Sequence, residues 1–414
     1  MGNNKKKPGH FGDKKVKKEK KPKREVLSFE ELPLDDYKKE EKKPKIKLDK
    51  KRVFMALGIV VLLVLSILVF FNRNALFGCS NEEEKSESFS VEVSGSSVEA
   101  GNIRTYEEGL VYCSDTNLVY VDTEGKEKFS IQHGFANPII KTSGDKTIAY
   151  DVGATDFVIA SNEGKVFSES MKDKIYSVDI TSEGIYAFVT ETKEYNSKLT
   201  VLGTNNEATY AYSFSEYRIF SMALNSTGTG AVVCGVSAQD GVGMSAVYIL
   251  DFTKKEPVAK HIISEDVVFD CEFLSDETAC VVGEEAAYIC KDDNFKRIER
   301  ISFSGMPLIT YGFDTEDSVA AFCVSRSGDG SNCNIIHVNS SGETEGVTET
   351  SYAIKSISLF DDVIAVTDTS NVYVMDNTGK VSNTLEAPSA VQVRLLSSDF
   401  LFVLGLNGIT GITL

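Results

Sequence analysis

Histidine and the short catalytic motifs are what this 414-residue sequence most clearly lacks. Its four histidines lie far apart in the chain: His10, His133, His261 and His337. No HExxH motif, no histidine pair at ligand spacing and no cluster of cysteine with histidine is present, which argues against a zinc site. No GxSxG elbow is present, although a fold could still assemble a Ser-His-Asp triad. We therefore predict no metal site and no cofactor, and assign no catalytic residue.

Helical periodicity is also lacking after residue 88, whereas charge is abundant and unevenly distributed. Residues 1–52 hold 20 Lys and Arg against 10 Asp and Glu, while the chain after Arg73 holds 23 against 51. Basic segments beside a membrane resist translocation, so we expect a cytoplasmic N-terminus and an extracellular C-terminus. A strongly acidic exterior argues against nucleic acid as a partner.

One long uncharged run, residues 53–71, lies between Lys50, Lys51 and Arg52 on one side and Arg73 on the other. As a helix it would be about 28 Å long, close to the roughly 30 Å hydrocarbon core of a bilayer. The alternative, a buried core helix of a soluble protein, is usually shorter and amphipathic. The run predicts a single membrane-spanning helix over residues 53–72, with the protein in the cell membrane and in contact with its lipid.

The segments around this helix also carry predictions. Residues 1–52 are too charged to form a core, so we expect a disordered basic cytoplasmic tail that contacts anionic lipid and whose residues 26–37 could dock on a partner. Residues 73–87 read as a flexible extracytoplasmic spacer. The LFGCS sequence before that spacer's acidic part resembles a lipobox with Cys79 as the lipidated residue, but the long basic segment favours an uncleaved signal anchor.

Internal repeats organise residues 88–414. Eight segments share a buried strand rich in Val, Ala and Cys, a turn, a strand of the type VYVxD and a last strand after Gly-Lys: residues 109–130, 147–169, 184–213, 230–261, 278–300, 319–346, 363–384 and 400–414. Four strands per unit at a period of about 35 to 50 residues indicates a β-propeller. We predict an all-β ectodomain of eight blades, with seven as the alternative.

The two ends of this region predict how the ring closes. The last copy stops after its third strand, and residues 89–93 form a lone strand before the first copy. Together they complete one blade, which would protect edges that otherwise invite aggregation.

These repeats resemble those of YVTN and quinoprotein-type propellers. The whole layout is similar to a Gram-positive bacterial family of uncharacterised single-pass membrane proteins with a basic tail and a propeller ectodomain. The resemblance implies an architecture and an envelope location, not an activity. Quinoprotein blades normally place a Trp after the turn Gly, and this chain has no Trp, which removes much of the case for a quinone cofactor.

Cysteine and a few polar loops are the remaining candidates for chemistry. Four cysteines, Cys113, Cys234, Cys280 and Cys323, occupy equivalent places in the second strand of their copies, where they read as small core residues. Disulfides are conceivable within two sets: Cys271, Cys280 and Cys290, and Cys323 with Cys333. Residues 327–331 resemble an oxygen-rich calcium loop but lack the final Glu of an EF-hand, and a hairpin tip is expected there.

Two classes of function follow from the sequence. The first is a binding or scaffolding module that holds a protein, peptide or glycan at the cell envelope, with the acidic loops 264–266 and 283–285 as candidate partner surfaces. The second is an envelope hydrolase or lyase whose residues come from several blades and meet in the funnel. The lack of catalytic spacing favours binding. Acids with shifted pKa values, or Tyr and Arg converging in the funnel, would favour the enzyme, and an apolar funnel would argue against it.

Overall fold

The computed structural model describes residues 88–414, apart from residues 240, 315–317, 328–329 and 407. The predicted tail, membrane helix and spacer, with Cys79, lie outside the described residues. Within the described part, no helix has both the length and the apolar character needed to cross a membrane. The propeller lies within the compact unit Glu83–Leu414.

Eight four-stranded antiparallel sheets make up the described chain, which confirms the prediction of eight blades. Blades 1 to 4 consist of β2(Val98–Tyr106), β3(Gly109–Ser114), β4(Asn117–Asp122) and β5(Glu127–Gln132); β6(Pro138–Ser143), β7(Lys146–Asp151), β8(Asp156–Ser161) and β9(Gly164–Ser170); β10(Ile175–Ile180), β11(Tyr186–Thr190), β12(Ser197–Leu202) and β13(Ala208–Phe214); and β14(Arg218–Leu224), β15(Gly230–Gln239), β16(Val242–Asp251) and β17(Ala259–Ile263).

Blades 5 to 8 consist of β18(Val268–Ser275), β19(Thr278–Gly283), β20(Ala286–Lys291) and β21(Arg297–Ser302); β22(Leu308–Asp314), β23(Val319–Val324), β24(Asn334–Val338) and β25(Thr344–Glu349); β26(Ser356–Phe360), β27(Val363–Thr367), β28(Asn371–Asp376) and β29(Val381–Glu386); and β30(Gln392–Ser397), β31(Phe400–Leu404) and β32(Gly408–Thr413) with β1(Ser88–Glu92). The one helical element among the described residues is a 3-10 turn, η1(Asp293–Phe295).

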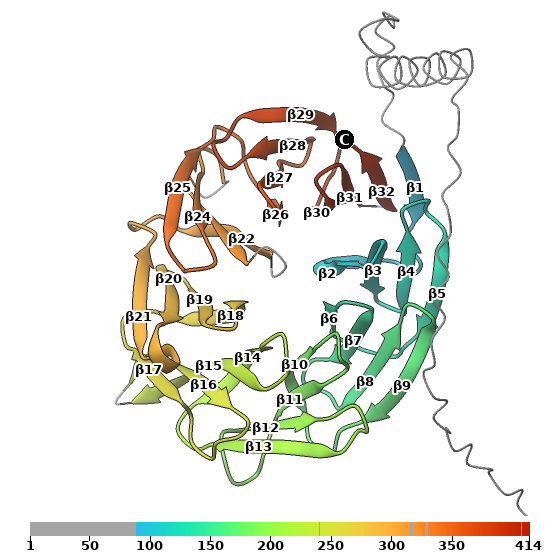
Figure 1. Cartoon of the computed structure of the whole chain (residues 1–414). Coiled ribbons are helices and arrows are strands. Elements are labelled where there is room, and N and C mark those ends of the chain that lie inside the picture. The colour runs from blue at the N-terminus through green and yellow to red at the C-terminus, as the bar shows by residue number, and fades with distance from the viewer. Residues whose placement is uncertain (1–87, 240, 315–317, 328–329, 407) are drawn as a thin grey trace, which may run out of the picture. The chain divides into compact units, whose positions relative to one another are not determined.

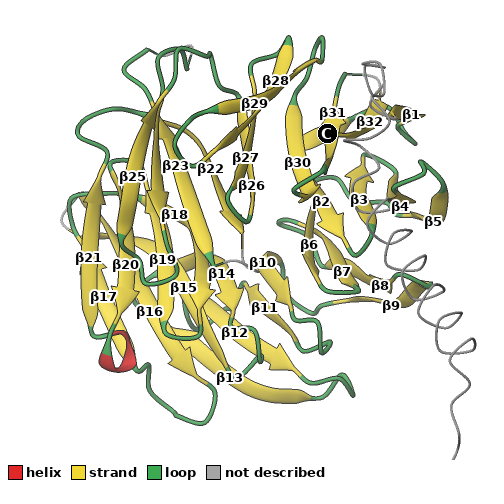
Figure 2. Ribbon diagram, turned by 45° about the horizontal axis from the view of Figure 1, so that its top comes forward, coloured by secondary structure: helices red, strands yellow, loops and turns green. Residues whose placement is uncertain are grey.

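The first strand of each blade lies nearest the axis of the ring, and successive first strands contact one another around it (Figure 1). Middle strands such as β3 are buried along their whole length, whereas the outermost strand β29 alternates between half-buried and exposed residues. The apolar core is divided into clusters that lie between neighbouring sheets, so each blade buries both faces against its neighbours (Figure 2). This packing explains why the second strands read as continuous apolar runs.

The ring closes as predicted, because β1 from the start of the propeller pairs with β32 from its end. Val91 lies opposite Ile409 in this antiparallel ladder. Phe89 packs its ring against Phe400 and Phe402, with centroid distances of 6.4 and 6.3 Å. One blade is therefore built from both ends of the propeller sequence, which ties the first blade of the chain to the last.

Candidate functional site at the propeller axis

Charged side chains from the innermost strands gather around the axis. We define the axial cluster as six residues on five blades: Arg104 on β2, Lys141 on β6, Asp179 on β10, Asp270 and Glu272 on β18, and Arg394 on β30. Asp179 is buried and the other five are half-buried. Burial lowers the pKa of Arg104 in blade 1, and the negative charges of Asp270 and Glu272 in blade 5, on the opposite side of the ring, act against this lowering.

Two guanidinium groups lie together at the junction of blades 8 and 1. The Nη1 atom of Arg104 donates to the backbone carbonyls of Gly101 and Ile103, and the Nε atom of Arg394 donates to the same Ile103 carbonyl at 3.3 Å. Gln392 ties the two inner strands together by accepting a hydrogen bond of 2.8 Å from the Gly101 backbone N–H. Burial lowers the pKa of Arg394, and the positive charge of Arg104 lowers it further. These neighbouring cations therefore repel each other.

Lys141 on blade 2 adds a third cation next to the two guanidinium groups of blades 8 and 1. Burial by itself would lower the pKa of the ammonium group, but the negative charges of Glu272, Asp179 and Asp270 outweigh it, so the pKa is raised. Within the described chain, the Lys141 Nζ atom makes no hydrogen bond or ion pair. Lys141 is therefore charged and held near carboxylates without contacting one.

Asp270 is the acid of the axial cluster that is held by the most hydrogen bonds. Its carboxylate accepts hydrogen bonds from Tyr311 OH at 2.7 Å, Ser221 Oγ at 2.9 Å and the Cys271 backbone N–H at 2.9 Å. Desolvation raises the pKa of Tyr311, and the negative charge of Asp270 raises it further, so the phenol stays protonated and keeps donating. Strands β14, β18 and β22 are held together through this one carboxylate.

The other two acids accept fewer hydrogen bonds, and the pKa of each is raised. Glu272 accepts a hydrogen bond of 3.2 Å from the Phe273 backbone N–H. Desolvation, together with the charges of Asp179 and Asp270, raises its pKa to about 8, although the positive charge of Lys141 lowers it. Asp179 accepts a hydrogen bond of 2.7 Å from the Leu224 backbone N–H, and desolvation raises its pKa as well. Perturbed carboxyl groups of this kind are found at functional sites.

The signs of charge are segregated around the axis. Arg394, Arg104 and Lys141 come from blades 8, 1 and 2, while the acids come from blades 3 and 5. No ion pair joins a cation of the axial cluster to one of its carboxylates. Acids with shifted pKa values and convergent Tyr and Arg side chains are thus both present, and the axis is not apolar.

The sequence reasoning missed every member of the axial cluster. The eight repeated segments begin at the second strand of each blade, so the innermost strands lie outside all of them. A usable signal was present, because Asp179 and Glu272 each lie between buried apolar residues of a short strand. A charge in such a strand costs free energy unless a partner or solvent meets it.

The predicted cysteines take the structural role expected for them. Cys113, Cys234, Cys280 and Cys323 all lie on the second strand of a blade and are at most 1% exposed. Six of the seven cysteines in the described chain are free thiols, and the seventh, Cys333, donates a hydrogen bond of 2.7 Å to the Gly330 carbonyl. Burial raises the pKa of the Cys113 thiol to about 12, which suppresses its reactivity.

The two sets considered for disulfides differ in geometry. Cys280 packs in the core between blades 5 and 6, whereas Cys271 and Cys290 face the core between blades 4 and 5, so no bond joins Cys280 to either. Cys323 and Cys333 share one core and interact, since a hydrogen bond with Cys333 and burial raise the Cys323 pKa. Sequence did not reveal that Cys234 of blade 4 meets Cys271 of blade 5.

The loops 264–266 and 283–285 lie together, but Asp266 is not available to a partner. It is 8% exposed, and its carboxylate accepts hydrogen bonds from the backbone N–H groups of Glu284 at 3.0 Å and Glu285 at 3.1 Å and from Tyr288 OH at 3.0 Å. The expectation that Asp266 lies on a partner surface is therefore wrong, because it bonds the second loop. Glu265, Glu284 and Glu285 remain exposed.

The remaining polar candidates stay apart. His133, His261 and His337 hydrogen-bond to Cys113, to the Phe295 carbonyl and to Thr348. The segment 327–331 joins β23 to β24, as expected for a hairpin tip, and its residues 328–329 lie outside the described residues.

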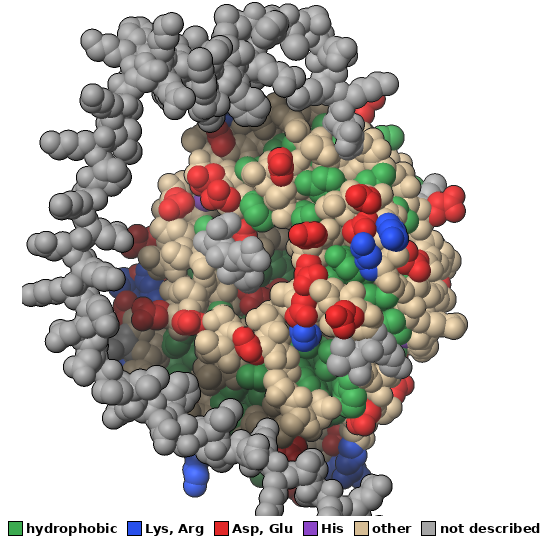
Figure 3. All heavy atoms as spheres, turned by 45° about the vertical axis from the view of Figure 1, so that its right-hand side comes forward, with side chains coloured by type: hydrophobic (Ala, Val, Ile, Leu, Met, Phe, Trp, Pro, Cys, Tyr) green, Lys and Arg blue, Asp and Glu red, His purple; other side chains and the backbone are tan. Residues whose placement is uncertain are grey.

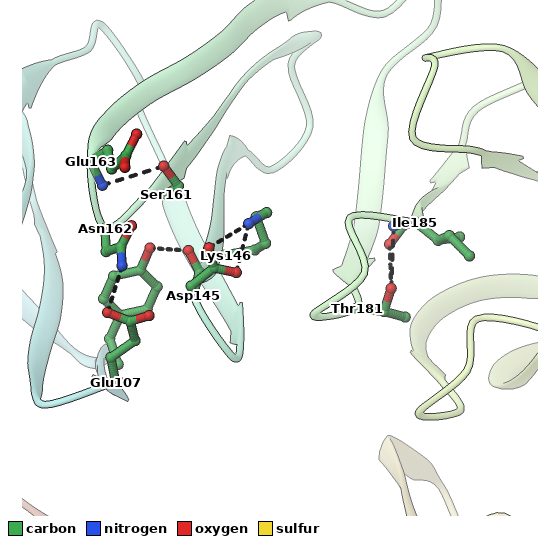
Figure 4. Close-up of polar contacts among 9 residues, drawn as sticks. Glu107, Asp145, Lys146, Ser161, Asn162, Glu163, Thr181 and Ile185 are labelled. Carbon is green, nitrogen blue, oxygen red and sulfur yellow. Dashed lines mark hydrogen bonds and ion pairs between the residues drawn. The ribbon is translucent and has the colours of Figure 1, made fainter. Parts of the chain in front are cut away.

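A shallow acidic groove of about 450 Å³ lies at the rim of blades 1 and 2 and was not predicted. Its lining includes Glu107, Asp122, Glu124, Glu163 and Asn162. Figure 4 shows Asn162 reaching toward Glu107, to which it donates a hydrogen bond of 2.8 Å. Acidic side chains are spread over the face seen in Figure 3, with few basic ones among them. The groove is part of a generally acidic surface.

The blades, their order and their closure define the chain as an eight-bladed β-propeller protein. The chain belongs to DUF5711, a family of unknown function, whose model matches residues 81–401. No curated protein matches it in sequence.

Solved structures share the fold at low identity. Sqt1 from Saccharomyces cerevisiae is 8% identical with a TM-score of 0.55, and the match covers 78% of this chain and 99% of that one. The C-terminal WD40 domain of Sif2 is 11% identical with a TM-score of 0.54, covering 79% and 98%. A eukaryotic initiation factor is 12% identical with a TM-score of 0.53, covering 78% and 90%. These likenesses show the fold alone.

Proposed function

We propose that this protein is a membrane-anchored binding module of a Gram-positive cell envelope, with its propeller on the outer side of the cell membrane. The uncharged run 53–71 and the basic segment before it support the anchor and its orientation. The acidic composition after Arg73 supports an exterior that meets a protein, peptide or glycan rather than nucleic acid.

The axial cluster is the observation that carries the binding function. Half-buried charges without ion-pair partners are costly to maintain in a folded protein, and a bound ligand of complementary charge offsets that cost. The propeller supplies rigid strands from five blades to hold these groups in place. Recognition needs only the charges that the strands present, whereas catalysis needs a positioned reacting group as well.

An envelope hydrolase or lyase is the second candidate, and Glu272 favours it. A carboxyl group whose pKa is about 8 is largely protonated at neutral pH and can act as a general acid. Arg104 interacts electrostatically with both Tyr311 and Glu272. This function would be established if the wild type turns over a bound glycan and the Glu272→Gln variant still binds that glycan but no longer turns it over.

Cross-linking of intact cells followed by recovery of the full-length chain tests the binding function. We expect wild type to capture a partner that is lost both from a chain without residues 88–414 and from an Arg104→Gln variant. Equal recovery by all three chains would contradict a binding role for the propeller. Protease added outside intact cells tests the orientation, and should digest the propeller while sparing the tail.

A further inference from the structure

The cationic and acidic halves of the axial cluster are arranged for two different groups of one ligand. Arg394, Arg104 and Lys141 form a continuous arc because β30, β2 and β6 are successive inner strands. Of the acids, Asp270 and Glu272 on β18 lie in the blade opposite that of Arg104, and Asp179 on β10 lies in the blade next to that of Lys141. A ligand of a single charge would satisfy one half and be repelled by the other.

The contacts within each half leave its charged or titratable groups without an ion-pair partner. Arg104 and Arg394 use their hydrogen bonds to the described chain on backbone carbonyls, and those neutral groups fix the guanidiniums without cancelling their charge. Two adjacent guanidiniums are well suited to a carboxylate, which accepts paired N–H donors. Glu272 and Asp179 accept hydrogen bonds from backbone N–H groups rather than from a cation, and a ligand ammonium beside Glu272 would ionise its carboxyl group, which is largely protonated at neutral pH in the unbound protein.

Neutralisation of the cations by the acids is the structural alternative, and apart from the through-space attraction that raises the pKa of Lys141, the geometry speaks against it. Opposite charges that exist only to neutralise each other are expected to meet in direct, hydrogen-bonded pairs when removed from water. Other cations of this propeller do so: Lys128 lies 2.8 Å from Asp122, and the largely buried Lys291 lies 2.8 Å from Glu299. No such pair forms within the axial cluster.

We propose that the axis binds a small zwitterion, a short peptide or amino acid with a free carboxylate against Arg104 and Arg394 and a free ammonium against Glu272 and Asp179. This inference rests on the proposed binding function and names its ligand class. Lys141 lies on the blade between Arg104 and Asp179, and its positive charge determines how well the site accepts a ligand with a second carboxylate.

Calorimetric titration of the full-length solubilised protein tests the inference with defined probes: Ala-Ala, alanine, N-acetyl-Ala-Ala and Ala-Ala-amide. We expect Ala-Ala or alanine to bind, with affinity at least tenfold weaker for each dipeptide that has a blocked end. Binding of N-acetyl-Ala-Ala as tight as that of Ala-Ala would overturn the zwitterion in favour of a simple anion site. No binding by any probe would also overturn it, while leaving partner capture by the cross-linking experiment as a separate result.

Variants locate the two ends of the ligand. Arg104→Gln should weaken Ala-Ala at least tenfold and Ala-Ala-amide much less, because the amide lacks the carboxylate. Glu272→Gln should weaken Ala-Ala and leave N-acetyl-Ala-Ala nearly unchanged. Lys172→Gln and Glu183→Gln, at exposed positions of the ring, are the matched controls. Equal losses for all probes in both axial variants would indicate structural damage and contradict the assignment, and thermal unfolding of each variant checks its fold.

Discussion

Tyr311 on β22 donates a hydrogen bond of 2.7 Å to Asp270 on β18 and so joins two neighbouring blades at the axis. Ser221 on β14 donates to the other carboxylate oxygen at 2.9 Å, which ties in a third blade. A carboxylate with this many donors is held in one position, and its negative charge acts on both Arg104 and Lys141. The axis is therefore ordered by hydrogen bonds as well as by apolar packing.

Tyr311→Phe removes that donor and keeps the ring. We expect the free energy of unfolding to fall by about 1 to 3 kcal/mol, because a hydrogen bond to a half-buried carboxylate is lost. Tyr195→Phe, at a residue that is 45% exposed, is the matched control and should change stability by less than about 0.5 kcal/mol. Urea unfolding of both variants measures the difference, and an unchanged Tyr311→Phe would contradict the role of this bond.

Glu272 should make stability depend on pH. Its pKa is about 8 in the folded chain, against an ordinary value of 4.5, so the folded state holds a proton that the unfolded state has lost between these values. This contribution is complete below about pH 4.5 and is lost as pH rises toward 8.

Glu272→Gln should remove that dependence. We expect wild type to lose about 1 to 3 kcal/mol relative to the variant between pH 5 and pH 8, as each pKa unit corresponds to about 1.4 kcal/mol. Denaturant unfolding at several pH values measures it, with the exposed Glu183→Gln correcting for the change in net charge. Parallel profiles for wild type and Glu272→Gln would show that the carboxyl group is ionised throughout.

Phe89→Ala tests the closure of the ring. The side chain packs against two aromatic rings across the seam of blade 8, so we expect a loss of about 2 to 4 kcal/mol in unfolding free energy. Leu406→Ala, at a residue that is 72% exposed, should cost less than about 0.5 kcal/mol. If calorimetry gives the two variants the same melting temperature, the seam contributes nothing to stability.

The buried cysteines should resist alkylation. All seven in the described chain are buried, and burial raises the pKa of several, to about 12 for Cys290. We expect iodoacetamide to leave them unmodified in the native protein and to label all seven after denaturation, as counted by mass spectrometry. Rapid labelling of Cys323 or Cys333 in native protein would contradict the packing described for blade 6.

The repeats could be predicted from the sequence because second and third strands are buried between blades, and burial on both faces leaves long apolar runs. The closing strand could be predicted because residues 400–414 hold one strand too few. Membrane anchoring stays a prediction, with lipidation of Cys79 as its disfavoured alternative, since those segments lie outside the described residues.

The candidate site could not be predicted in the same way. Arg104 and Glu272 are 168 positions apart in the sequence, and only closure of the ring brings their blades face to face. Asp266 shows the opposite error, because an acid in a polar loop reads as exposed until the fold supplies N–H donors for its carboxylate. Local pattern fixes burial along a strand, but not which strands meet.

A crystal structure of the full-length chain with Ala-Ala bound tests the central claim most directly. The account predicts the dipeptide at the propeller axis, its carboxylate beside Arg104 and Arg394 and its ammonium beside Glu272 and Asp179. A dipeptide bound in the reverse orientation, or bound only outside the axis, would contradict it.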